Sequence, residues 1–257
     1  MSEQRSAPER FDMTGHVAVV TGGGRGIGEG IAVAFAEAGA AVVVAARRAE
    51  EVERVAAAIR DGGGQAIAVP TDVTDDEAVE ALASAAVAEF GRLTTWVNNA
   101  GGSPTRQPLV ELPREEWDRT LALNTTAVYV GCVTAARHMD TGSIINISSP
   151  AGSHAIPLSG HYGAAKAAAN SLTWTLAVEL APRVRVNAVA PGAVPTEVMM
   201  TALDLDEEGV DGLVKSWRIP MRRLGTPQDI GTACVYLASD AASWVTGEII
   251  RVAGGPR

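Results

Sequence analysis

The stretch Thr21-Gly22-Gly23-Gly24-Arg25-Gly26-Ile27-Gly28 decides the fold of this 257-residue chain. It directly follows the β-branched run His16–Thr21 and opens a segment with helical spacing. Glycines in such a turn let the backbone reverse tightly and approach a pyrophosphate, while the helix N-terminus supplies unpaired N–H groups and a positive dipole end. The stretch therefore predicts a dinucleotide site. Its contacts are expected from Gly22, Arg25, Gly26, Ile27 and Gly28.

Outward from this turn, apolar runs typical of strands alternate with segments of helical spacing. The runs are continuously apolar, as in parallel strands that crossover helices bury on both faces. They are His16–Thr21, Ala41–Ala46, Ala66–Val69, Thr95–Asn98, Ser143–Ser148, Val184–Ala190 and Ile249–Val252. The expected helices are Ile27–Ala38, Glu50–Arg60, Asp75–Phe90, Arg114–His138, Tyr162–Leu180 and Pro227–Ala238. We therefore expect an α/β fold with a doubly wound, Rossmann-like parallel sheet and helices on both faces.

We expect a flexible N-terminal segment at residues 1–12 and a single catalytic domain at residues 13–257. No repeat, low-complexity tract or linker divides the chain. The segment Pro195–Arg223 breaks the alternation and looks like an irregular insertion over the edge of the sheet. Its adaptable apolar side chains are Met199, Met200, Leu203 and Trp217. Such a segment suits the covering of a hydrophobic substrate, and simple packing onto the sheet is the alternative.

Composition excludes several kinds of partner. The formal net charge of -9 repels nucleic acid and anionic membrane surfaces at long range, so neither is expected. Cys132 and Cys234 are far apart, and the four histidines show no ligand spacing, so we expect neither a disulfide framework nor a metal site. Met1–Arg10 has no signal-peptide pattern, and no apolar run approaches the roughly 20 residues that span a bilayer. We expect a cytoplasmic protein.

The end of the second expected strand bears on the choice of nicotinamide cofactor. An acidic residue there would hydrogen-bond the ribose 2′-hydroxyl of NAD. Here Ala46 takes that position, Arg47 and Arg48 follow it, and Arg25 projects from the glycine turn. Guanidinium groups bind a 2′-phosphate in a bidentate manner, although an arginine pair at a helix start is also an ordinary solvated feature. We favour NADP(H) over NAD(H).

Tyr162 and Lys166 are four residues apart in a helical segment, so their side chains share a face. An adjacent ammonium favours the phenolate and lowers the tyrosine pKa from its ordinary value of about 10, which makes Tyr162 a candidate acid/base. Ser149 follows a strand end, where ligands meet an open α/β sheet, and can hydrogen-bond a substrate oxygen. A turn role for Ser149 before Pro150 is the alternative.

Taken together, these motifs make the chain similar to the short-chain dehydrogenase/reductase family, of the single-domain type. The resemblance covers roughly residues 13–255. It rests on Thr21–Gly28, Asp72-Val73, Asn98-Asn99-Ala100-Gly101, Asn124, Ser149, Tyr162 with Lys166, Asn187, Pro191-Gly192, Thr196 and Arg223-Leu224-Gly225-Thr226-Pro227. The chain departs from the common pattern at Gly23-Gly24, at Thr94 in place of an Asp, and at Ala253 in place of an Asp.

The resemblance implies hydride transfer between a nicotinamide and a carbonyl or secondary alcohol. Tyr162 would exchange a proton with the substrate oxygen, and Ser149 would polarise that oxygen. Lys166 would bind the nicotinamide ribose and lower the tyrosine pKa, while Asn124 would hold a water that connects the lysine to solvent. The implied cofactor contacts are Asp72 and Val73 at the adenine, Asn99 at the adenosine ribose, and Val194 and Thr196 at the nicotinamide carboxamide. Further cofactor contacts are expected from Ala100, Gly101, Pro191 and Gly192.

The resemblance leaves the substrate open. The general pattern is similar to 3-oxoacyl-carrier-protein reductases, for which an acyl carrier protein would be an acidic partner. Asn99-Ala100-Gly101-Gly102 and Ala242–Gly247 instead resemble bacterial hydroxysteroid dehydrogenases. The family also implies a homotetramer with the Tyr162–Leu180 helix at an interface. The alternative function is a non-catalytic NADP-binding sensor, against which the complete set of catalytic residues argues.

His154 and His161 bracket the loop before Tyr162. They either line the substrate pocket or are exposed loop residues.

Overall fold

The computed structural model describes residues 6–204 and 207–255 of the chain. The strands within that part are β1 Val17–Thr21, β2 Ala41–Ala46, β3 Gln65–Pro70, β4 Thr95–Asn98, β5 Gly142–Ile147, β6 Val184–Pro191 and β7 Ile249–Val252. They pair in parallel in the order β3-β2-β1-β4-β5-β6-β7. The order reverses direction between β1 and β4, which is where ligands bind in open α/β sheets. The predicted doubly wound fold is confirmed.

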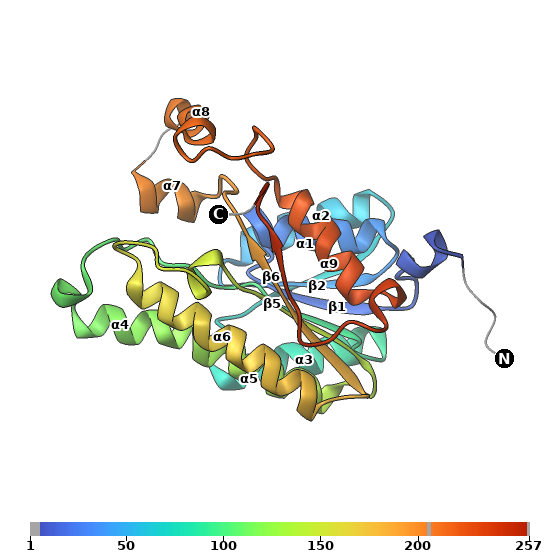
Figure 1. Ribbon diagram of the computed structural model, residues 1–257. Helices are drawn as coiled ribbons and strands as arrows, with labels where there is room; N and C mark the ends of the chain where they lie inside the picture. Colours follow the sequence, from blue (N-terminus) through green and yellow to red (C-terminus); the bar gives the residue numbers. More distant parts are fainter. Residues whose placement is uncertain (1–5, 205–206, 256–257) are drawn as a thin grey trace.

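Helices cover both faces of this sheet (Figure 1). They are α1 Gly26–Glu37, α2 Ala49–Asp61, α3 Asp76–Phe90, α4 Arg114–Leu121, α5 Ala127–His138, α6 Gly160–Glu179, α7 Glu197–Leu203, α8 Glu207–Ser216 and α9 Pro227–Ala238. Short turns lie at η1 Pro8–Phe11, η2 Leu109–Glu111, η3 Ala122–Thr126, η4 Pro150–Gly152 and η5 Asp240–Ala242. α1, α2 and α9 pack in one core, and α3, α5 and α6 pack in the other.

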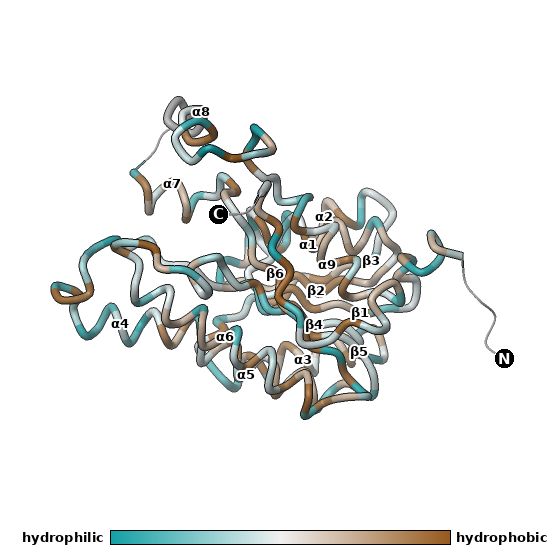
Figure 2. Tube along the Cα trace, viewed as in Figure 1, coloured by the Kyte–Doolittle hydropathy of each residue, from teal (hydrophilic) through white to brown (hydrophobic). Residues whose placement is uncertain are grey.

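The strands supply side chains to both cores because successive residues point to opposite faces. On β1, Val20 packs in the core of α1 and α9, whereas Val19 packs in the core of α3 and α5. Figure 2 shows the hydrophobic colour concentrated along these central strands. Burying both faces explains why the strand runs are continuously apolar.

The expected single helix at Arg114–His138 is interrupted by the π-helical turn η3. The N–H of Ala127 donates to the carbonyl of Ala122, five residues back. The side chain of Asn124 explains the interruption, since its Nδ2 donates to the carbonyl of Thr120 at 3.0 Å and competes with the regular backbone ladder. The helix therefore bulges at Asn124, one of the predicted site residues.

The sequence suggested that Pro195–Arg223 is an irregular insertion. The segment instead forms α7 and α8, which lie over the carboxyl ends of the strands (Figure 1). Thr196 supplies the start of α7, because its hydroxyl accepts a hydrogen bond from the N–H of Met199. The N-cap at Thr196, and with it the start of α7, was not predicted from the sequence. The consequence is a helical cover at the edge where ligands bind.

The expected flexible segment at residues 1–12 lies partly outside the described residues, which begin at 6. From there η1 is anchored rather than free. The guanidinium of Arg10 donates to the carbonyl of Asp240 and the hydroxyl of Ser243, both at 3.0 Å, and the Phe11 ring lies 6.2 Å from that of Tyr236. These contacts join η1 to residues more than 200 positions away in sequence, and the expected flexibility of the segment stays a prediction.

Candidate active site

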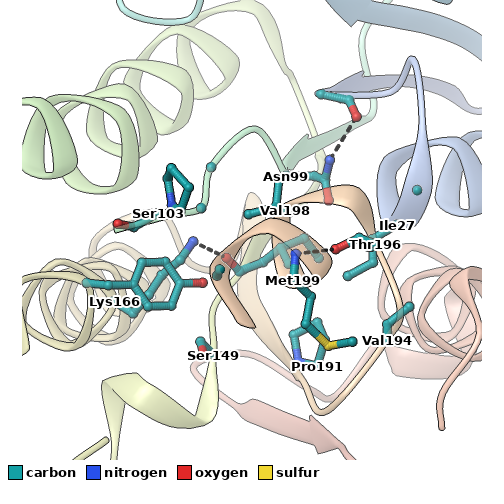
Figure 3. Close-up of a pocket in the computed structure, with 18 of the residues that line it drawn as sticks. Ile27, Asn99, Ser103, Ser149, Lys166, Pro191, Val194, Thr196, Val198 and Met199 are labelled. Atoms are coloured by element: carbon teal, nitrogen blue, oxygen red, sulfur yellow. Dashed lines mark hydrogen bonds between the residues drawn. The ribbon is translucent and has the colours of Figure 1, made fainter. Parts of the chain in front are cut away.

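A cavity of about 1930 Å³ lies at the carboxyl edge of the sheet (Figure 3). Its lining contains most of the predicted site. These residues are Gly22, Arg25, Gly26, Ile27, Gly28, Arg47, Arg48, Asp72, Val73, Asn99, Ala100, Gly101, Ser149, Tyr162, Lys166, Pro191, Gly192, Val194 and Thr196. Asn124 is the predicted residue that does not line it. Residues from seven separate stretches of sequence thus meet around one space.

Hydrogen bonds between Thr21 and Asn99 fix the glycine turn at the end of β4. The N–H of Asn99 donates to the hydroxyl of Thr21 at 3.0 Å. The Asn99 side-chain amide donates to the carbonyls of Thr21 and Gly22, at 2.9 and 3.1 Å. We call this set of bonds the Thr21–Asn99 clamp. It commits the Asn99 amide to the turn, whereas the sequence suggested a contact with ribose.

The turn itself has room only for glycine at critical positions. Gly22 and Gly26 have φ values of +64° and +56°, which L side chains rarely adopt. A Cβ at Gly28 would lie 2.1 Å from the carbonyl oxygen of Gly22. No side chain caps the N-terminus of α1. The resulting surface of bare backbone beside a helix N-terminus fits a pyrophosphate.

The arginines near Ala46 are engaged differently from one another. Arg48 forms a 2.9 Å ion pair with Glu51, and Arg25 pairs with Glu197 at the start of α7. Two of the three guanidinium groups that the sequence suggested for a 2′-phosphate therefore have carboxylate partners in the structure. The sequence alone did not indicate these two acidic partners. Glu51 lies one helix turn after Arg48, and Glu197 lies 172 positions after Arg25.

Arg47 lies on the same wall of the cavity as Asp72. Hydrogen bonds from the backbone and side chain of Thr74 lower the pKa of Asp72, and the charge of Arg47 lowers it further. Asp72 is therefore ionised at neutral pH and structures the loop after β3 through Thr74. This places one cation and one anion at the expected adenine end.

Ser149 has the turn role that its sequence suggested, and it also lies next to Tyr162. Its hydroxyl caps η4 by accepting a hydrogen bond from the N–H of Ala151 at 3.2 Å. The same side chain hydrogen-bonds Tyr162. The turn thus holds the hydroxyl against the tyrosine, where both groups can meet one substrate oxygen.

Asn170 supports this arrangement from behind. It accepts a hydrogen bond from the hydroxyl of Ser148 at 2.5 Å and donates to the carbonyl of Gly152 at 3.3 Å. Its spacing could have revealed it, because Asn170 lies four residues beyond Lys166 and so continues the same helical face.

Lys166 is buried beside the tyrosine. Its Nζ donates to the carbonyl oxygen of Ile147 at 2.8 Å and lies 5.7 Å from the centroid of the Tyr162 ring. Burial lowers the pKa of Lys166 to about 8. The ammonium is therefore the main form at neutral pH but titrates far more easily than an exposed lysine.

The tyrosine pKa differs from the sequence expectation. Burial raises the pKa of Tyr162 to about 12, and the opposing effect of the hydrogen bond with Ser149 is smaller. We expected the nearby ammonium to lower this pKa, but the loss of hydration on burial shifts the pKa upward. Tyr162 is protonated at neutral pH and can donate a proton.

Asn124 lies behind the cavity wall. Its Oδ1 accepts from the N–H of Gly102 at 2.8 Å, and its Nδ2 donates to the carbonyls of Gly102 and Thr120, each at 3.0 Å. A Cβ at Gly101 would lie 2.8 Å from Oδ1 of Asn124 and 3.3 Å from Nζ of Lys166. The side-chain amide of Asn124 therefore fixes the backbone of Gly101 and Gly102, which forms the cavity wall next to Lys166.

The two histidines of the preceding loop separate in the structure. His154 is exposed and lines the cavity. His161 is fully buried at the start of α6, and its Nε2 lies 2.9 Å from the hydroxyl oxygen of Ser103. Neither of the uses considered from the sequence applies to His161. Sequence reasoning missed the pairing with Ser103 because the two residues are 58 positions apart.

No group of three or more His, Cys, Asp and Glu residues in the described part of the chain is arranged to hold a metal ion. No helix among the described residues is long and apolar enough to cross a membrane.

Comparison with known proteins agrees with this geometry. A family model described as "Enoyl-(Acyl carrier protein) reductase" matches residues 22–256. The cis-4-hydroxycyclohexanecarboxylate dehydrogenase of Sinomonas cyclohexanicum is 43% identical over 243 residues, covering 93% of this chain and 95% of that protein. The 3β-hydroxysteroid dehydrogenase 1 of Eggerthella lenta is 41% identical over 253 residues, covering 95% and 94% of the two chains.

A solved structure shows the same fold. It is a 7α-hydroxysteroid dehydrogenase complexed with NADH and 7-oxo glycochenodeoxycholic acid, with a TM-score of 0.89 and 35% identity over 98% of each chain. The relatives named here are dehydrogenases that act on hydroxyl groups. With its parallel sheet, its glycine turn and the match along nearly its whole length, the chain belongs to the short-chain dehydrogenase/reductase family of oxidoreductases.

Proposed function

We propose that this protein is an NADP(H)-dependent oxidoreductase that interconverts a carbonyl and a secondary alcohol, with Tyr162 as the acid/base. One observation carries the proposal: Ser149, Tyr162 and Lys166 share a cavity with an uncapped glycine turn that fits a pyrophosphate. A general acid must lie within hydrogen-bond reach of the reacting oxygen and hold the right protonation state. Tyr162 meets the second condition, because its raised pKa keeps it protonated.

Each residue has a distinct part in carbonyl reduction. Tyr162 donates its phenolic proton to the substrate oxygen, and the hydroxyl of Ser149 hydrogen-bonds the same oxygen. Lys166, fixed by the carbonyl of Ile147, places a positive charge near the tyrosine and stabilises the phenolate that is left behind. A nicotinamide bound in this cavity would supply the hydride. Asn124 and Asn170 act as positioning residues through Gly102 and through η4.

The preference for NADP(H) rests on the wall formed by Ala46, Arg47 and Arg48. A carboxylate that would bind a ribose 2′-hydroxyl is absent at position 46, where the chain has alanine. Arg47 lines the cavity and has a carboxylate, Asp72, as its nearby counter-charge. Arg48 is held by Glu51. Arg47 is therefore the guanidinium best suited to a 2′-phosphate.

The other end of the cavity suits a hydrophobic ketone. Val198, Met199 and Leu203 of α7 line it, together with Trp217 and Ile219. Steroid ketones and 3-oxoacyl thioesters are both compatible with such a wall, and an acyl carrier protein would present the latter. A surface for self-association is also available: Trp174 and Val178 on α6 are 53% and 80% exposed, and Tyr129 on α5 is 51% exposed. We propose that this face forms an interface of a homotetramer.

Replacing Tyr162 with Phe tests the catalytic role. The variant keeps the ring next to Lys166 but removes the proton donor, so kcat/KM for NADPH-dependent ketone reduction should fall more than about 100-fold. NADPH affinity, measured by fluorescence titration, should change little. Tyr236→Phe is a matched control, because Tyr236 lies on α9 outside the cavity lining, and it should keep full activity.

Cyclohexanone, a steroid ketone and a 3-oxoacyl thioester would form the substrate panel for both variants. Activity of Tyr162→Phe within about tenfold of the parent would contradict the assignment of the acid. If the parent binds NADPH but turns over no member of the panel, the non-catalytic sensor is favoured instead.

Replacing Arg47 with Ala tests the cofactor choice. Loss of a guanidinium contact to the 2′-phosphate should lower kcat/KM for NADPH by about 10- to 100-fold and leave the value for NADH nearly unchanged. Arg60→Ala is the control, because Arg60 pairs with Glu53 outside the cavity lining. A parent enzyme that uses NADH as well as NADPH would refute the preference.

The pH dependence of ketone reduction tests the role of Lys166. Reduction requires protonated Tyr162 and charged Lys166. Tyr162 keeps its proton until about pH 12, whereas Lys166 loses its charge as the pH rises through about 8. We therefore expect kcat/KM to be constant below about pH 7 and to fall above about pH 8. A plateau that extends to pH 10, the range of an ordinary lysine, would show that the burial of Lys166 does not control the reaction.

A further inference from the structure

Ser103 is a small polar side chain in the lining of the cavity. It lines the cavity together with Pro104, Val198 and Met199. Figure 3 shows Ser103 on the same side of the pocket as Lys166, with Val194 and Thr196 on the other side. Apolar pockets achieve specificity through a small number of well-placed polar groups. Ser103 can act as such a polar group only if the structure holds its hydroxyl in place.

The backbone next to Ser103 is fixed by Asn124. Two hydrogen bonds, at 2.8 and 3.0 Å, join the Asn124 amide to the N–H and the carbonyl of Gly102. On the other side of the chain, a Cβ at Gly102 would lie 2.9 Å from Val198, so α7 packs directly against this backbone. Ser103 therefore projects from a wall that is held on both sides.

The side chain of Ser103 is fixed by His161. The distance from its hydroxyl oxygen to Nε2 of His161 is 2.9 Å, and the imidazole is completely buried. Nδ1 of His161 has no hydrogen-bond partner among residues 6–204 and 207–255. A buried polar atom without a partner costs free energy, so a histidine at this position needs a compensating role.

The protonation of His161 sets what Ser103 presents to the cavity. Burial lowers the pKa of His161 more than the nearby charge of Glu116 raises it, so the imidazole is neutral and carries one N–H. An orphaned buried N–H is rarer than an orphaned acceptor, which favours the proton on Nε2. That N–H donates to the oxygen of Ser103. The hydroxyl hydrogen of Ser103 then remains available to a ligand.

We infer that Ser103, oriented by His161, is a specificity-determining residue that donates a hydrogen bond to a second oxygen of the substrate. The substrate class is a ketone, or the corresponding secondary alcohol, with an additional hydroxyl or carbonyl oxygen away from the reacting carbon. The reacting oxygen itself is met by Ser149 and Tyr162, so it does not need Ser103. This inference rests on the proposed function and specifies the substrate of that same site.

The test compares ring ketones that differ only in the second oxygen. kcat/KM is measured with NADPH for cyclohexanone and for 2-, 3- and 4-hydroxycyclohexanone. The parent enzyme should prefer at least one hydroxyketone over cyclohexanone by about tenfold, the range expected for one hydrogen bond. Ser103→Ala should reduce that preference to near unity. Thr105→Ala, in the same loop but outside the cavity lining, should keep it.

Variants of His161 separate positioning from simple packing. His161→Gln can retain a donor near the position of Nε2 and should keep most of the preference, whereas His161→Phe fills the space without a donor and should lose it. In the double variant Ser103→Ala with His161→Phe, the losses should not add, because both changes remove the same contact. If His161→Gln and His161→Phe both keep the preference for the hydroxyketone, the positioning role of His161 is contradicted.

The outcomes distinguish this inference from the proposed function. If the parent reduces cyclohexanone and all three hydroxyketones with equal kcat/KM, or if Ser103→Ala keeps the parental preference, the inference is wrong while the oxidoreductase activity stands. If the parent reduces none of the ketones, the proposed function fails with it. A stable Ser103→Ala variant with a lost preference supports the inference.

Discussion

The Thr21–Asn99 clamp is the interaction on which the rest of the site depends. It joins the ends of β1 and β4, the two strands between which the sheet order reverses. The glycine turn leaves from one side of this clamp, and Ala100-Gly101-Gly102 leaves from the other. Because Gly101 lies against Lys166 and Asn124, the same clamp sets the distance between the proposed cofactor end and the catalytic end. The clamp therefore fixes the two walls of the cavity, the glycine turn and the segment after β4, relative to each other.

The catalytic wall combines groups that are costly to bury. Helix α6 carries a histidine, a tyrosine and a lysine near its start, and burial shifts the pKa of each towards its neutral form. Each has a specific hydrogen bond that offsets part of this cost: Lys166 to Ile147, Tyr162 to Ser149, and His161 to Ser103. Such an arrangement is expected where strained electrostatics serve a reaction rather than stability.

Local sequence patterns predicted the strands, most of the helices and part of the cavity lining. The bounds of β2, β4, β7 and α9 agree with expectation, because continuous apolar runs and the Thr226-Pro227 start are strong local signals. The features that were missed depend on side-chain contacts, most of which are distant in sequence. Asn124 bends its helix through side-chain competition, Glu197 reaches Arg25 across the cavity, and Ser103 meets His161 only in the folded chain. The partners in each of the last two pairs are too far apart in the sequence for a local pattern to indicate their contact.

The central claim is that a hydride passes from a nicotinamide to a carbonyl carbon in this cavity. The most direct measurement uses NADPH that carries deuterium in turn at each face of the nicotinamide C4, with cyclohexanone as acceptor and mass spectrometry of the alcohol formed. The account predicts that the product gains one deuterium at the carbinol carbon from one face of the ring and none from the other. Alcohol without deuterium from either face, or a cofactor that binds and is never oxidised, would contradict it.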